Sequence, residues 1–139
     1  MNGTFNRLCI VLGIMLVTAV PSFAACQASI EGDWDVYFTP SDGSPPFYCN
    51  VSLVEGSSGF TSDLANCLST SSHTYSIESV TLSCLEENTN YYGGQIVLTV
   101  DGSSSTVSVQ GTLNQNANMF VAMSTNTVAP YYTLQFVMD

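Results

Sequence analysis

The stretch QIVLTVDGSSSTVSVQGTL, residues 95–113, shows most clearly how this chain of 139 residues folds. Apolar and polar residues alternate on both sides of Asp101-Gly102, a dipeptide typical of the tight reversal between two antiparallel strands. Because successive side chains of a strand point to opposite faces, one face of this hairpin is apolar. The residues expected on that inward face are Ile96, Leu98, Val100, Val107, Val109 and Leu113. The stretch therefore predicts a β-hairpin with one face against a core.

The same alternation recurs along the chain, interrupted by turn residues. It predicts seven strands and allows an eighth around Phe60; the seven are expected at residues 32–39, 47–55, 74–84, 95–100, 105–113, 119–124 and 131–138. A change of phase near Glu78 or Ser79 predicts a β-bulge. Residues 63–68 are compatible with a single helical turn capped by Ser62.

Short links between consecutive strands determine the expected architecture. We expect one all-β domain over residues 25–139, an antiparallel meander of seven to eight strands that closes as a small barrel. A β-sandwich is the alternative, since the alternation of side chains along each strand is the same in both.

Residues 1–24 have the features of a secretory signal peptide. One positive residue, Arg7, precedes an apolar run over residues 8–20, and Ser22 and Ala24 occupy the small-residue positions before a cleavage site. The run is shorter than the ~20 residues that cross a bilayer comfortably. We therefore expect a mature chain that begins at Ala25 and is secreted or periplasmic.

A second cleavage pattern overlaps the first. The segment FAAC, residues 23–26, resembles a bacterial lipobox, in which Cys26 would be lipidated and would attach an outer-membrane lipoprotein to the membrane. Cleavage after Ala24 without lipidation leaves an even set of cysteines that can pair fully: Cys26, Cys49, Cys67 and Cys84. Lipidation of Cys26 would leave an odd thiol, so cysteine parity favours ordinary secretion and disulfide bonds.

The charge of the chain excludes several functions. There are eleven acidic residues and a single Lys or Arg, Arg7, which lies in the leader. The mature chain therefore has no lysine or arginine with which to displace counterions from phosphate, and we expect it not to bind nucleic acid. A charged partner should be a cation or a basic protein. The simpler interpretation of the acidity is solubility, because like charges keep copies apart, and we expect a monomer.

The first expected strand begins with IEGDW, residues 30–34, which holds the only tryptophan of the chain. Its Gly32-x-Trp34 resembles the motif at the first strand of lipocalins and related small barrels, and a similar motif opens avidin-like barrels. The resemblance implies a barrel that carries a ligand, with Trp34 and Phe38 in or near the pocket. The lysine or arginine that covers the motif tryptophan in lipocalins has no counterpart here. The alternative is that Trp34 and Phe38 are core residues, with the Trp34 N–H bonded locally.

The meander also predicts which cysteines pair. If the first hairpin reverses at residues 40–46, Phe38 lies opposite Cys49, near the turn end. A single reversal through residues 56–72 then returns Cys84 to the level of Cys49, and leaves Cys26 and Cys67 at the opposite end. We therefore predict the bridges Cys49–Cys84 and Cys26–Cys67.

Few side chains of the mature region offer chemistry. His73, the only histidine, lies in a polar stretch, and no Gly-x-Ser-x-Gly elbow accompanies it, so we interpret it as a surface histidine. Asp33 and Asp35 share one face of a strand and could bind Ca²⁺ together with Asp42 or loop carbonyls, but no calcium-loop motif supports this, and solvated carboxylates are the simpler interpretation. We expect no catalytic group, no metal and no cofactor.

These observations favour an exported, non-catalytic binding module: a small β-barrel that carries a small apolar ligand or docks a protein partner. The alternative is a surface or envelope structural protein, an adhesion-type β-sandwich that acts through protein–protein contacts at its strand edges. A barrel carrier would hide its edges and stay monomeric, whereas an assembling sandwich would change size with concentration. A small hydrolase is a third hypothesis that almost no residue supports.

Overall fold

The computed structural model describes residues 26–57, 59–126 and 130–139. The expected signal peptide, residues 1–24, and the expected first mature residue, Ala25, lie outside the described residues. The part of the chain that the structure describes contains no helix long and apolar enough to cross a membrane.

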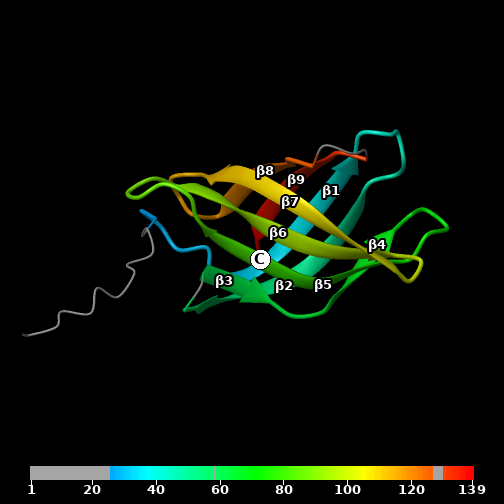
Figure 1. The fold of residues 1–139 in the computed structure, drawn as a ribbon, viewed down its shortest axis with the longest axis horizontal. Helices are drawn as coiled ribbons and strands as arrows, with labels where there is room; N and C mark the ends of the chain where they lie inside the picture. Colours follow the sequence, from blue (N-terminus) through cyan, green and yellow to red (C-terminus); the bar gives the residue numbers. More distant parts are fainter. Residues whose placement is uncertain (1–25, 58, 127–129) are drawn as a thin grey trace, which may run out of the picture.

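The described residues form nine strands joined in one antiparallel sheet (Figure 1). The strands are β1 Gly32–Pro40, β2 Phe47–Gly56, β3 Gly59–Ser62, β4 Ala65–Ser69, β5 Tyr75–Cys84, β6 Tyr91–Val100, β7 Ser103–Leu113, β8 Met119–Ser124 and β9 Tyr132–Met138. The first strand pairs with the last, β9, as well as with β2, so the sheet closes on itself. The architecture is therefore a barrel, and the predicted all-β antiparallel meander is confirmed.

The strands β3 and β4 together fill one position in the barrel wall. β3 pairs with the end of β2, and β4 pairs with its beginning, while both pair with β5 on their other side. In Figure 1 the two short strands lie toward opposite ends of the barrel. The wall thus has eight strand positions. The eighth strand allowed around Phe60 is confirmed as β3, whereas the helical turn over residues 63–68 is wrong, because Ala65 and Asn66 pair with β5.

The hairpin and the bulge predicted from the sequence are both present. β6 and β7 pair from Tyr91↔Thr112 to Val100↔Ser103. Asp101 and Gly102 have φ of 49° and 80°, so both central residues have the positive φ that a tight reversal of this kind requires. Between Ile77 and Ser79 the register of β5 shifts against β6, which accounts for the change of phase near Glu78.

The inward side chains of the described strands pack together inside the barrel. The inward residues of the strands form a single buried cluster, whose largest fully buried members include Trp34, Tyr92, Phe38, Phe120 and Phe136. An eight-stranded barrel is just wide enough for side chains to fill it. Trp34 and Phe38 are therefore core residues, and both are fully buried.

The two disulfides are Cys26–Cys84 and Cys49–Cys67. All four cysteines predicted to be oxidised are bonded, but the predicted bridges Cys49–Cys84 and Cys26–Cys67 are wrong. The expected register is also wrong, since Phe38 lies opposite Phe47, not opposite Cys49. The apolar phase of a strand repeats every second residue, so alternation alone does not distinguish registers that differ by two.

The wrong pairing follows from the segment after β2. The prediction treated residues 56–72 as one reversal, which would run β5 back toward Cys49. In the structure β3 and β4 first return along β2, so β5 runs in the same direction as β2 and carries Cys84 to the opposite end of the barrel. The additional pass along β2 also places Cys67 directly opposite Cys49.

Candidate functional site

Exposed aromatic and apolar side chains gather on the outer face of β1, β2 and β4. Tyr37 and Tyr48 are register partners, and their rings stack with centroids 5.6 Å apart. Leu68 is the register partner of Tyr48 on the next strand. The three residues are 43%, 37% and 63% exposed, respectively. Together with Pro46 and Thr70 they line a hollow of about 300 Å³, which we call the aromatic hollow.

A second hollow, which we call the gap hollow, lies farther along β2. The pairing of β2 with β4 ends at Cys49, and its pairing with β3 begins at Val54. The short strands separate from β2 between these points, because residues 63 and 64 belong to neither strand. The result is a hollow of about 560 Å³ with a mixed lining, whose polar residues include Asn50, Ser52, Thr61 and Asp63.

Both hollows lie along the outward-facing residues of β2 and along Pro46, the residue that precedes this strand. Period two places Pro46, Tyr48, Asn50, Ser52 and Val54 on the same outer face, and all five are exposed. We call this strip, with its two hollows, the β2 wall. The opposite wall, formed by β6 and β7, presents mainly Ser, Thr and Gln at its outward positions.

Two carboxylates of β1 border the β2 wall. Asp33 and Asp35 are the register partners of Ser52 and Asn50, so they share its outer face, as the alternation predicted. Asp35 accepts a hydrogen bond from the side-chain amide of Asn50 at 3.2 Å.

The calcium site considered from the sequence does not assemble. Asp42 lies in the turn beyond β1, where its carboxylate accepts a hydrogen bond from the backbone N–H of Ser44 at 2.9 Å. This bond lowers the pKa of Asp42 below its ordinary value. Within the described ranges, no three Asp, Glu, His or Cys side chains are grouped to hold a metal ion.

His73 lies at the end of the barrel that carries the Asp101-Gly102 turn. Its Nδ1 is 2.5 Å from the Asp101 carboxylate, and the two side chains are 55% and 52% exposed. Asp101 also accepts a hydrogen bond from the backbone N–H of Thr74 at 2.8 Å. This bond, followed by the contact with His73, lowers the pKa of Asp101. The pair fastens the β6–β7 turn to the start of β5.

Trp34 and Phe38, the residues that the lipocalin resemblance places at a pocket, line neither hollow. The indole N–H of Trp34 donates to the backbone carbonyl of Ile30 at 2.9 Å, which satisfies the buried donor locally. Phe38 stacks on Phe47 with ring centroids 4.7 Å apart, inside the core.

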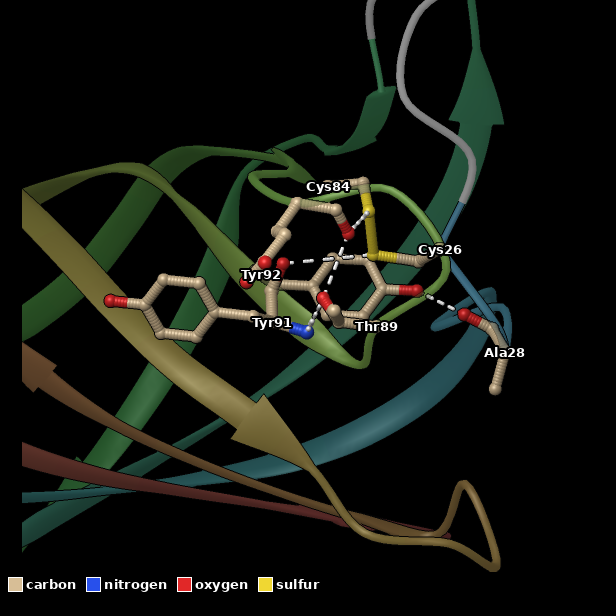
Figure 2. The surroundings of a disulfide bond; sticks show 7 residues. Cys26, Ala28, Cys84, Thr89, Tyr91 and Tyr92 are labelled. Carbon is tan, nitrogen blue, oxygen red and sulfur yellow. Dashed lines mark hydrogen bonds between the residues drawn. A yellow bond between two sulfur atoms is a disulfide. The ribbon is translucent and has the colours of Figure 1, made fainter.

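The N-terminal segment is fastened across the other end of the barrel (Figure 2). Cys26 is bonded to Cys84, and the backbone N–H of Gln27 donates to the carbonyl of Thr89 at 2.9 Å. The hydroxyl of Tyr92 points out of the core and donates to the carbonyl of Ala28. Burial raises the pKa of this phenol. Because a thioether-linked lipid and a disulfide use the same sulfur, this bridge and lipidation of Cys26 exclude each other.

The fold and its surface define a class: a small antiparallel β-barrel with a packed interior, two disulfides and an aromatic, acid-bordered outer wall. The sequence matches no protein-family model, and no curated protein is significantly similar to it.

The sequence-based prediction missed the β2 wall as a site. Tyr37 and Tyr48 flank the first expected turn and lie in the polar phase of their strands, together with Asp35 and Asn50. These two large aromatic side chains at outward positions were the sequence signal that could have indicated a binding surface. Leu68 gave none, because its segment was not expected to be a strand.

Proposed function

We propose that this protein is an exported, non-catalytic binding module that contacts a protein partner through the β2 wall. The observation that carries the proposal is the exposed cluster of Tyr37, Tyr48 and Leu68, arranged as register neighbours on three adjacent strand positions. Tyrosines on a rigid sheet offer large contact area at little conformational cost, and aromatic residues are enriched where proteins bind one another.

The packed core is a reason to propose the outer wall, and not the interior of the barrel, as the binding surface. A barrel that carries a ligand needs an internal cavity of about 300–1,000 Å³. The inward positions instead hold rings that contact one another, as in Phe47 and Tyr75 with centroids 4.0 Å apart, and Phe120 and Phe136 at 5.0 Å.

Closure of the sheet argues against the alternative function, that of a structural protein which assembles through its strand edges. An adhesion-type sandwich would use free strand edges to join its copies. In this barrel β1 is paired on both sides, with β2 and with β9. A protein partner that meets the face of the wall therefore suits the structure better than assembly through strand edges.

The two disulfides support export. Such bonds form and persist in secreted and periplasmic proteins. Since Cys26 is one of the bonded residues, the proposal is a soluble protein of the periplasm or the extracellular space, with no lipid on Cys26.

A matched pair of variants tests the binding surface. Tyr37→Thr with Tyr48→Thr removes the aromatic pair and keeps residues that favour strands. The control is Val97→Thr with Thr106→Ser, a register pair on the opposite wall. Each labelled protein is applied to an array of random-sequence peptides of about ten residues, long enough to cover the β2 wall.

We expect the wild-type protein and the control to bind a common set of peptides, and the tyrosine variant to lose most of that set. Leu68→Thr, a separate change in the same hollow, should weaken the same peptides. Circular dichroism checks that each variant is folded. Failure of the wild-type protein to bind any peptide, or binding that survives the loss of both tyrosines, would overturn the proposal.

A further inference from the structure

We infer that the partner segment is an extended peptide bearing lysine or arginine that lies along the β2 wall; the inference rests on the proposed function. It concerns the chemistry of the partner, which the aromatic cluster alone leaves open. Shape, charge and ring exposure each point to it.

The shape of the wall fits an extended chain. The aromatic hollow and the gap hollow follow one another along β2, and Tyr48 lies in the first while Asn50 lies in the second. From Pro46 to Val54 a strand advances about 27 Å at ~3.4 Å per residue. A narrow strip of this length matches one extended segment better than a compact ligand.

The charge of the wall fits a cationic occupant. Asp33 and Asp35 border the strip on β1, and Asp63 lines the gap hollow on the other side. The described residues include no lysine or arginine, so none of these carboxylates is paired with one within the protein. A lysine or arginine of a partner would therefore meet carboxylates on both sides of β2.

The exposed rings supply the second element of recognition. Tyr37 and Tyr48 present about two fifths of their surface to solvent, and Asp35 is the next outward residue of β1 beside Tyr37. A guanidinium or ammonium group within about 6 Å of a tyrosine ring is attracted by the ring quadrupole. The polar groups of Asn50, Ser52 and Thr61 are available to hydrogen-bond the peptide backbone in the gap hollow.

The same charge distribution disfavours the other occupants of such a surface. A second copy of this chain would bring its own Asp33, Asp35 and Asp63 and no lysine or arginine from its described residues, so two β2 walls would repel each other. Nucleic acid and anionic lipid are repelled for the same reason.

Three synthetic peptides of about ten residues test the inference, each long enough to follow the strip. They alternate threonine with lysine, with serine or with glutamate, so that the three peptides share every threonine and present a positive, a neutral or a negative side chain at every second residue. Binding is measured by fluorescence anisotropy at low salt. We expect the lysine peptide to bind, the serine peptide to bind at least about tenfold more weakly, and the glutamate peptide not to bind.

Charge-neutral variants locate the interaction. Asp33→Asn with Asp35→Asn should weaken the lysine peptide about fivefold, as expected for two exposed ion pairs. The control, Glu86→Gln with Glu87→Gln, removes the same charge from an exposed loop at the end of the barrel and should leave affinity within about twofold. Tyr37→Thr with Tyr48→Thr should weaken binding by about tenfold or more.

The outcomes separate the inference from the proposed function. Equal loss of affinity in the Asp33/Asp35 and Glu86/Glu87 variants would mean that net charge alone attracts the peptide, and it would overturn the inference. Array peptides that depend on Tyr37 and Tyr48 but show no enrichment of lysine or arginine would overturn it too, while leaving the proposed function in place. Absence of any tyrosine-dependent binding would overturn both.

Discussion

Cys26 is bonded to Cys84 across 58 residues of sequence, because β5 ends at the same end of the barrel at which the N-terminal segment enters β1. The position of Cys84 depends on the return of β3 and β4 along β2. The Cys26–Cys84 bridge can therefore form only if the strands from β1 to β5 have the order and direction seen in the structure.

The disulfide map is the first prediction. Mass spectrometry of the unreduced protein after pepsin digestion should find peptides joined through Cys26–Cys84 and Cys49–Cys67. Trypsin is unsuitable, since the described residues contain no lysine or arginine. A peptide joining Cys49 to Cys84 would show that β5 runs in the opposite direction, and a diacylglyceryl group on Cys26 would show that this protein is a lipoprotein.

The two bridges should contribute unequally to stability. In the chain-entropy model a loop of 58 residues stabilises by about 4 kcal/mol and one of 18 residues by about 3 kcal/mol. We therefore expect Cys26→Ser with Cys84→Ser to lower the free energy of unfolding by about 1 kcal/mol more than Cys49→Ser with Cys67→Ser. Urea unfolding of both double variants measures the difference, and the reverse order would contradict the entropic account.

Trp34 should behave as a core residue with a satisfied donor. Trp34→Phe removes ring volume and leaves the carbonyl of Ile30 without its partner, and we expect a loss of about 2–4 kcal/mol in the free energy of unfolding. The control, Tyr37→Phe on the outer wall, should change stability by less than about 0.5 kcal/mol. In the wild-type protein, acrylamide should quench the Trp34 emission poorly. Ready quenching would show that water and small solutes reach the interior.

The Asp101 carboxylate should make stability depend on pH in the acid range. Its pKa lies below the ordinary value of 3.8, because it accepts hydrogen bonds from Thr74 and His73. A group whose pKa is lower in the folded state stabilises the fold above its unfolded pKa, and this contribution is lost as pH falls through the folded value. As the pH falls below about 4, the free energy of unfolding of Asp101→Asn should therefore decrease less steeply than that of the wild-type protein.

Thermal unfolding of the wild-type protein and of Asp101→Asn is measured between neutral pH and about pH 2. The difference in stability between the two proteins at each pH isolates the contribution of Asp101, because the other carboxylates contribute equally to both. Glu86→Gln is the control, since it neutralises a loop carboxylate at the other end of the barrel. Parallel stability curves for wild type and Asp101→Asn would contradict the prediction.

Gly94 should tolerate no side chain. An added Cβ in this part of β6 would collide with the backbone carbonyl oxygen of Thr81 on β5. Gly94→Ala should therefore lower the free energy of unfolding by about 2–3 kcal/mol, as overpacking does. Gly56→Ala is the matched change at a strand end where the nearest atom, the carbonyl oxygen of Gly59, is 3.5 Å away. Equal stability of the two variants in urea would mean that β5 and β6 are farther apart than in the structure.

The sequence by itself determined most of the local structure, with residues 63–68 as the exception. Alternation placed Ile96, Leu98 and Val109 in the core, the Asp101-Gly102 dipeptide set the hairpin, and the change of phase located the bulge beside Glu78. These features depend on neighbouring residues and on the two-residue period of a strand, so short segments contain all the information. The acidity of the chain and the number of its cysteines can likewise be read from the sequence without knowledge of the fold.

Only the tertiary structure decided which strands meet. Whether residues 59–69 form a reversal or a return pass along β2 depends on pairing with β2 and β5, and that pairing gives β5 its direction and Cys67 its partner. Closure through β1 and β9 made the sheet a barrel. The β2 wall has the same origin, since Tyr37, Tyr48 and Leu68 come from three strands and become neighbours only through the registers of β1, β2 and β4. Register and strand order are long-range properties that alternation within a strand does not specify.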